Sequence, residues 1–155
     1  MAEKDASRRA ITILCAEDDA DDRMLMRDAL EESQLGDRLV FVEDGEELMA
    51  YLRRQGQWTD ATLSPRPGLI LLDLNMPRKD GREALREIKQ DERLRLIPVV
   101  VLTTSSAEAD ILSSYGIGAN SYIIKPVTFD GLVGVMRALG RYWSNIVALP
   151  AIDHA

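Results

Sequence analysis

Three carboxylates of this sequence follow directly after short apolar runs. Asp73 ends "GLILLD", and Glu17 and Asp18 end "AITILCAED". A carboxylate at the end of a buried segment is costly unless a partner offsets its charge. Because acids brought together repel one another, we expect a cation among them. Oxygen ligands of this kind favour Mg²⁺ or Mn²⁺ over zinc, and a backbone carbonyl near Asn75 could supply a further ligand.

Two other groups suit chemistry at a phosphorus centre. Thr103 begins the hydroxyl run "TTSS", and Lys125 closes "SYIIK". A carboxylate beside a divalent ion can attack phosphorus and form an aspartyl phosphate. An ammonium and a hydroxyl can then offset the charge on the equatorial oxygens. We therefore predict Asp73 as the nucleophile, Lys125 as the ammonium and Thr103 as the hydroxyl.

Taken singly, these residue types have simpler explanations. Thr103 alone could be an ordinary strand-end hydroxyl, and Lys125 alone a surface charge. Asp19, Asp21 and Asp22 stand where a helix should begin, and acids there favour the positive end of the helix dipole. We therefore interpret these three acids as helix-start residues. The prediction of a site rests on the convergence of the other groups.

That convergence requires a parallel sheet, because the carboxyl ends of its strands share one edge. Five apolar runs alternate with helical patterns, and they span residues 10–16, 38–42, 69–72, 97–102 and 121–125. The first, third and fourth are apolar almost throughout, as is typical of strands covered on both faces. Five strand–helix repeats predict a doubly wound (βα)5 domain of the α/β class, which binds ligands beyond the carboxyl ends of its strands.

The helical patterns are less uniform than the strands. Ala109, Ile111 and Leu112 mark a fourth helix. Because residues 53–68 contain Gly, Ser and Pro, we expect them to form a long surface loop. The last helix carries more apolar residues toward its end than one face needs: Leu139, Tyr142, Trp143, Ile146 and Val147. These residues pack either on the domain's own core or in a symmetric homodimer.

Composition excludes several classes of function. The chain has 155 residues and a net charge of -7, which argues against a broad nucleic-acid surface. Its single histidine, His154, and single cysteine, Cys15, leave no Ser-His or Cys-His mechanism, zinc site or internal disulfide. The N-terminus lacks an apolar h-region, and no later stretch is apolar enough to span a membrane. We expect a cytoplasmic protein without membrane contacts.

The motifs "EDD", "LLDLNMPRKDG", "VVLTTSS" and "SYIIKP" together resemble the receiver domain of two-component response regulators. The resemblance implies a flavodoxin-like fold with sheet order 2-1-3-4-5. The receiver would span 10–147, with terminal tails at 1–9 and 148–155. A sensor histidine kinase would be the phosphoryl donor. The motifs "DLNMPRKDG", "TTSS" and "RYW" further resemble the stand-alone, phytochrome-associated regulators of bacteria, which implies a phytochrome as that kinase.

The resemblance also implies a role for each acid of the site. Asp73 corresponds to the phosphoacceptor and Asp18 to the direct ligand of Mg²⁺ or Mn²⁺. Glu17 corresponds to a second acid that reaches the metal through water, and Asn75 contributes its backbone carbonyl. Lys125 corresponds to the family's lysine.

The same resemblance implies a conformational switch beside the site. Thr103 corresponds to the switch hydroxyl and Tyr122 to the switch aromatic, and the Lys125–Pro126 bond would be cis, with Pro126 as the cis-proline. We hypothesise that phosphorylation draws Thr103 toward Asp73 and that Tyr122 fills the vacated space. The face built from the fourth helix, the strand 121–125 and the last helix would change with it, and a homodimer would form there.

Two other functions compete with this interpretation. A phosphatase with an Asp nucleophile would share the acid and the metal, but it needs a general acid two residues after the nucleophile, where Asn75 stands. An inert interaction module would need none of these groups, yet Asp73, Asp18, Thr103 and Lys125 are all present. We therefore expect a phosphoacceptor with self-catalysed transfer and dephosphorylation, not a turnover enzyme.

Overall fold

One parallel sheet organises the chain. The computed structural model describes residues 11–33 and 38–149, apart from the side chains of residues 144 and 145. The strands are β1 (Thr12–Ala16), β2 (Arg38–Val42), β3 (Leu69–Leu72), β4 (Val99–Thr103) and β5 (Ser121–Ile124), in the order β2-β1-β3-β4-β5. All neighbouring pairs are parallel. The predicted doubly wound fold and strand order are confirmed.

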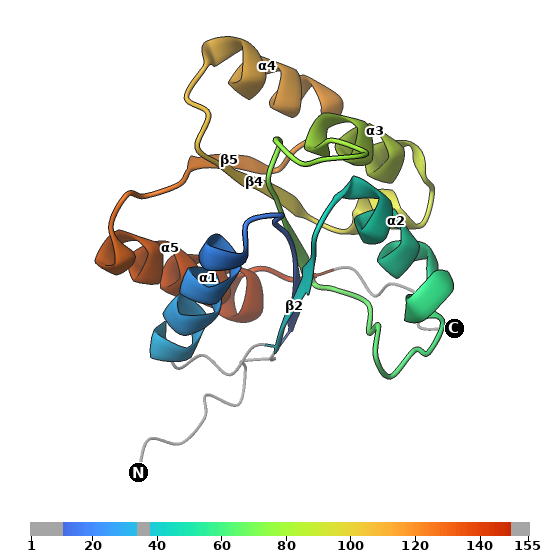
Figure 1. Cartoon of the computed structure of the whole chain (residues 1–155), viewed down its shortest axis with the longest axis horizontal. Coiled ribbons are helices and arrows are strands. Elements are labelled where there is room, and N and C mark those ends of the chain that lie inside the picture. The colour runs from blue at the N-terminus through green and yellow to red at the C-terminus, as the bar shows by residue number, and fades with distance from the viewer. Residues whose placement is uncertain (1–10, 34–37, 150–155) are drawn as a thin grey trace.

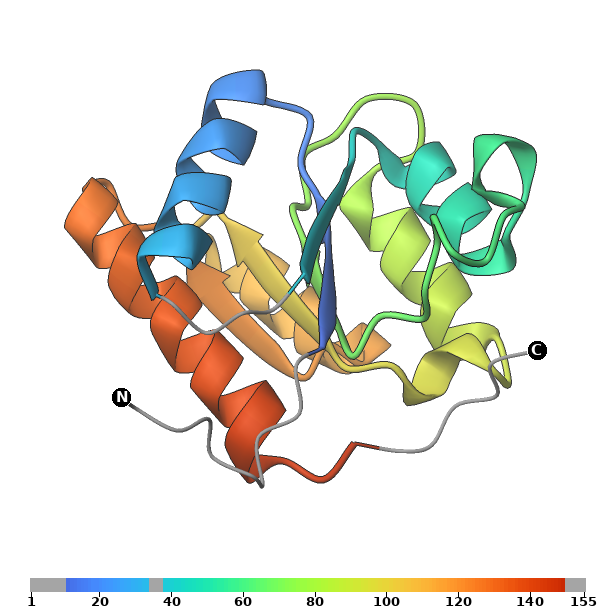
Figure 2. The ribbon, with the colours of Figure 1, turned by 90° about the horizontal axis from the view of Figure 1, so that it is seen from below.

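Helices cover both faces of this sheet. They are α1 (Ala20–Ser33), α2 (Gly45–Arg53), α3 (Gly81–Gln90), α4 (Glu108–Ile117) and α5 (Phe129–Arg141). α1 packs against α5, while α2, α3 and α4 are neighbours on the opposite face (Figure 1). Figure 2 shows the same two layers from below, with the sheet between them. Right-handed crossovers between parallel strands produce this division.

The central strand divides its side chains between two apolar cores. Ile70 and Leu72 face the core under α2 and α3, whereas Leu69 and Leu71 face the core under α1 and α5. All four side chains are completely buried. Alternation along a strand sends successive side chains to opposite faces, so a strand covered on both sides has to be apolar throughout. Asp73 follows directly after these four residues.

The fourth strand begins later than its apolar run. It was predicted at 97–102 and is observed at Val99–Thr103. Ile97 instead closes a short 3-10 helix, where its amide donates to the carbonyl of Leu94. Pro98 has no amide hydrogen to donate. At the other end, Thr103 pairs with Ile124, which brings its hydroxyl onto the carboxyl edge of the sheet.

The loop predicted at 53–68 is held by its own polar contacts. It contains a 3-10 turn at Gly56–Trp58. The Tyr51 hydroxyl donates to the carbonyl of Pro65 over 2.7 Å, and the buried Ser64 hydroxyl contacts the carbonyls of Trp58 and Asp60. The loop lies beside α2.

The apolar residues at the end of α5 divide between the core and the surface, and the homodimer stays a prediction. The helix continues into a π-helical turn at Tyr142–Ile146. Leu139 and Trp143 are buried in the core with α1, whereas Tyr142 and Ile146 are exposed. Within the described residues, no helix is long and apolar enough to cross a membrane. The predicted N-terminal tail lies outside the described residues. So does the predicted C-terminal tail from residue 150 onward, which includes His154.

Candidate functional site

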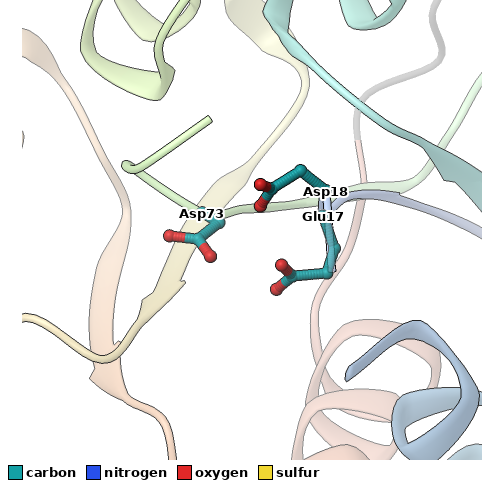
Figure 3. Close-up of side chains that lie close together, drawn as sticks. All are labelled: Glu17, Asp18 and Asp73. Carbon is teal, nitrogen blue, oxygen red and sulfur yellow. The ribbon is translucent and has the colours of Figure 1, made fainter. Parts of the chain in front are cut away.

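The three predicted carboxylates meet at the carboxyl edge of the sheet. Ala16 pairs with Leu72, so β1 and β3 end side by side, and the amide of Asp73 donates to the carbonyl of Ala16 over 3.2 Å. Figure 3 shows the side chains of Glu17, Asp18 and Asp73 around one space. One oxygen from each lies within 4.8 Å of the others. The parallel register therefore brings together acids that are more than fifty residues apart in the sequence.

Asp73 is oriented by groups from three elements. Its Oδ1 accepts the Thr103 hydroxyl over 2.9 Å and the amide of Asn75 over 3.1 Å. Its Oδ2 accepts the Lys125 ammonium over 3.2 Å. Asp73 is 8% exposed and Thr103 is completely buried. Both carboxylate oxygens thus have fixed donors, and the side chain is held toward the acids of β1.

The start of α3 presses directly on the backbone of Asp73. Asp80 caps this helix by accepting the amides of Arg82 and Glu83, and the amide of Gly81 donates to the carbonyl of Leu74. A Cβ at position 81 would lie 2.2 Å from the carbonyl oxygen of Asp73. Only glycine allows this approach. The "DG" after the acid therefore sets the path of the chain beyond the strand.

Lys125 lies at the centre of a charged cluster. Its ammonium forms ion pairs with Glu17, with Asp22 over 3.0 Å and with Asp73 over 3.2 Å. Its side chain is only 10% exposed. Burial, the largest influence, lowers the pKa of Lys125, but the hydrogen bond that Lys125 donates to Glu17 and the charges of Asp73 and Glu17 outweigh it and raise the pKa above its usual value. The lysine is a permanent cation in this environment.

Glu17 is the most deeply buried acid of the cluster. Glu17 is only 2% exposed to solvent. Burial raises its pKa to about 7, because the hydrogen bond and charge of Lys125 offset only part of the desolvation and Asp73 adds repulsion. A second positive charge at this position would favour the ionised form. The acid cluster therefore carries more negative charge than Lys125 alone can offset.

The acids at the start of α1 divide into two roles. Asp19 Oδ1 accepts the amides of Asp21 and Asp22 over 2.8 and 3.1 Å, so Asp19 acts in the helix start as predicted. Asp22 differs, because its carboxylate reaches Lys125. The sequence interpretation missed this contact. No spacing rule could reveal it, because it depends on how α1 packs against α5, the helix that follows Lys125.

The switch residues lie close to the site. Tyr122 is half-buried, and its hydroxyl donates to the carbonyl of Ser105 over 2.9 Å. Thr103 already contacts Asp73, so in this conformation no movement is needed to bring the two together. The hypothesised movement stays a prediction.

A second polar network ties the loop after β4 to two helices. Asp110, in the first turn of α4, accepts the Ser105 hydroxyl over 2.6 Å and the guanidinium of Arg82 over 2.7 Å. Both hydrogen bonds lower the pKa of Asp110, and the one from Ser105 has the larger effect. Since Tyr122 donates to Ser105, the aromatic ring, the loop and the start of α3 form one connected unit. The sequence interpretation did not identify Arg82 or Asp110.

The expected cis bond before Pro126 is wrong. Among the residues that the structure describes, all peptide bonds are trans. The trans form of an X–Pro bond is intrinsically favoured by roughly 0.5–1 kcal/mol. The strand pairing is unaffected, because the amide of Lys125 still donates to the carbonyl of Thr103 over 2.8 Å.

The donor set fits a divalent cation that prefers oxygen. Glu17, Asp18 and Asp73 supply three carboxylates within reach of one ion. Asp18 is exposed, which leaves a path for entry and for water ligands. No sulfur or imidazole lies in this group, so the set does not suit zinc. The carbonyl of Asn75 as a further ligand stays a prediction.

Comparison with known proteins gives a consistent picture. The model of the response regulator receiver domain matches residues 13–137. Response regulator Rcp1 of Synechocystis sp. is 43% identical over 147 residues, covering 95% of this chain and 98% of Rcp1. A crystal structure of the phosphorylated cyanobacterial phytochrome response regulator RcpA has a TM-score of 0.84 and 43% identity, covering 92% of this chain and all of that one. The Mn²⁺-bound form of Rcp1 has a TM-score of 0.81 and 43% identity, covering 91% of this chain and 99% of Rcp1.

Proposed function

Since the chain belongs to the family of response regulator receiver domains, we propose that it accepts a phosphoryl group on Asp73 from a sensor histidine kinase. One observation carries the assignment to Asp73. Among the described residues, this carboxylate alone joins the acid cluster, the Thr103 hydroxyl and the Lys125 ammonium. Of the three acids, Asp73 is the one that accepts the Thr103 hydroxyl, over 2.9 Å.

The transfer exchanges one bond to phosphorus for another. An Asp73 carboxylate oxygen attacks the phosphorus of a phosphohistidine, and the bond from phosphorus to the imidazole nitrogen breaks. The electron pair of that bond stays on the imidazole, which takes up a proton. Lys125 and Thr103 donate to the oxygens of the transferred group.

A divalent cation, when bound, supplies the positive charge that offsets the phosphoryl oxygens. Glu17, Asp18 and Asp73 would hold Mg²⁺ or Mn²⁺, with Asn75 contributing its carbonyl. The Mn²⁺-bound form of the relative Rcp1 supports this choice of metal. Hydrolysis of the acyl phosphate returns Asp73 to its free form, so the protein is a phosphoacceptor and not a turnover enzyme.

The output would pass through the connected unit behind the site. Thr103 and Tyr122 form the switch, because the Tyr122 hydroxyl is bound to the loop that leads from Thr103 to α4. A change in the hydrogen bond of Thr103 would move this loop and with it the face of α4 and β5. That face carries exposed apolar side chains, which supports a homodimer.

A phytochrome is our proposed kinase. The similarity to a cyanobacterial phytochrome response regulator over most of the chain supports it. The surface beside Lys125 suits a protein donor, because Leu25, Val127 and Phe129 expose apolar groups around a small pocket next to the site. Exposed apolar side chains that lie together beside polar groups are typical of a surface that a protein partner covers.

Incubation with Mg²⁺ and acetyl phosphate tests the function. We expect one phosphoryl group per chain by intact mass spectrometry, and none in Asp73→Asn. Asp18→Asn should lower the extent of labelling at limiting Mg²⁺. Continuous release of phosphate from varied phosphate esters would indicate the phosphatase instead, and no adduct at all would indicate the inert module.

A further inference from the structure

Asp22 contacts the site from outside the acid cluster. It stands in the first turn of α1 and pairs with the Lys125 ammonium over 3.0 Å. Resting on the proposed function, we infer that Asp22 is a positioning residue that anchors Lys125 throughout phosphoryl transfer. Neither the family match nor the motif resemblance assigns it a role.

The inference begins with the donor capacity of the lysine. An ammonium has three N–H groups and no acceptor. In this structure the Lys125 ammonium contacts three carboxylates, those of Glu17, Asp22 and Asp73. Each N–H therefore has its own acceptor, and the ammonium is held from three directions.

Two of these three partners change during the proposed reaction. Asp73 becomes an acyl phosphate, so its carboxyl group loses the charge that attracts Lys125. Glu17 belongs to the set of oxygens that would share a cation. Asp22 is outside that set and keeps its charge before and after transfer. It is the one carboxylate partner of Lys125 whose interaction is the same in both states.

The position of Asp22 suits an anchor. Its amide donates to Asp19 Oδ1, so it sits in a capped helical turn. α1 is fixed to the domain through buried residues that include Met26 and Ala29. A group on a packed helix holds its partner more precisely than a group on a loop. The side chain of Asp22 is 37% exposed against 10% for Lys125, so it holds the ammonium from the solvent side.

Neighbouring Asp21 provides a matched control. It lies in the same first turn, it is exposed, and it carries the same charge. No side-chain contact of Asp21 is among the hydrogen bonds and ion pairs of the described residues. Any effect of charge on the helix dipole or on the local field should therefore appear in Asp21→Ala as well as in Asp22→Ala.

Phosphorylation rates test the role with Mg²⁺ in excess and a fixed concentration of acetyl phosphate. We expect Asp22→Ala to slow labelling by about five- to tenfold, as for the loss of an orienting charge-assisted hydrogen bond. Asp21→Ala should be labelled at the wild-type rate. Asp22→Asn keeps an acceptor oxygen, so its labelling rate should lie closer to the wild-type rate than that of Asp22→Ala. In a Lys125→Met background, Asp22→Ala should add nothing. Equal rates in Asp22→Ala and Asp21→Ala, or a faster Asp22→Ala, would overturn the inference.

Side-chain NMR tests the anchor without any phosphoryl transfer. The Nζ resonance of Lys125, assigned by its loss in Lys125→Met, should be protected from exchange with water in the wild type and in Asp21→Ala. It should lose that protection in Asp22→Ala. If the wild type takes up no phosphoryl group, the proposed function fails while this measurement still decides the anchor. Unchanged protection in Asp22→Ala would show that Asp22 does not hold the lysine.

Discussion

Glu17 places a carboxylate where burial makes ionisation costly. Its folded-state pKa of about 7 lies above the ordinary glutamate value of 4.5, and desolvation by burial is the main cause. A raised pKa means that folding favours the protonated form. The resulting stability is fully present below the unfolded value and is lost as the pH rises through the folded value. Above neutral pH, the ionised acid therefore destabilises the metal-free protein.

Glu17→Gln should stabilise the metal-free protein at alkaline pH. Gln has nearly the shape of the protonated acid and cannot ionise, so we expect a gain of about 2 kcal/mol near pH 8 and a much smaller gain near pH 5. Urea unfolding in the presence of a chelator measures both values. Asp18→Asn is a useful control because Asp18 is exposed. A Gln variant less stable than the wild type at both pH values would contradict the prediction.

Residue types alone revealed most of the site but not all of it. Asp73, Thr103 and Lys125 were predictable because each stands at the end of an apolar run, and parallel strands end at one edge. Asp22 was not predictable, because its contact spans 103 residues and joins a helix to a strand end. A helix-start acid that only caps and one that also reaches the site look alike in sequence.

Among the elements, α3 is the one whose start most directly sets the site. The close approach of Gly81 to the carbonyl of Asp73 means that any side chain there must push the helix or the strand end aside. Asp80 followed by Gly81 is typical of a helix start. The sequence does not predict that Gly81 meets the backbone of Asp73, because this contact depends on how the chain crosses from β3 to α3.

Gly81→Ala and Gly134→Ala should have opposite effects on stability. A Cβ at position 81 lies 2.2 Å from a backbone oxygen, so we expect a loss of about 1–3 kcal/mol. Gly134 is exposed in α5, and a Cβ there meets nothing within 4 Å. Alanine at that helix position should add roughly 0.5–1 kcal/mol. Chemical unfolding reports both changes, and a Gly81→Ala protein as stable as the wild type would show that α3 can shift freely.

The apolar pattern of α4 predicted a helix correctly but not the face that is buried. Leu112 is 72% exposed, and Ser114 is the buried residue of this helix. Helical periodicity locates a stripe of apolar residues, but a stripe that serves a partner and one that serves the core have the same period. Only the packing of the element separates the two cases.

On the scale of the whole molecule, three of the exposed apolar side chains lie on the neighbouring elements α4 and β5. Leu112, Tyr115 and Ile124 lie on these two neighbouring elements and are 72%, 49% and 47% exposed. Trp143, just after α5, is not an exposed residue of this kind, because it packs in the core. A charge at Trp143 would disturb the fold itself, so the exposed residues are the better probes of self-association.

Charged substitutions on that face should dissociate the proposed dimer. A glutamate buried in an apolar contact costs several kcal/mol, which raises the dissociation constant by about a hundredfold or more. We therefore expect Leu112→Glu and Ile124→Glu to shift the mass of the phosphorylated protein in sedimentation from dimer to monomer. Leu63→Glu is the matched control, because Leu63 is 54% exposed on the loop beside α2. If the wild type is monomeric with and without phosphoryl, or if all three variants behave alike, this face is not a dimer interface.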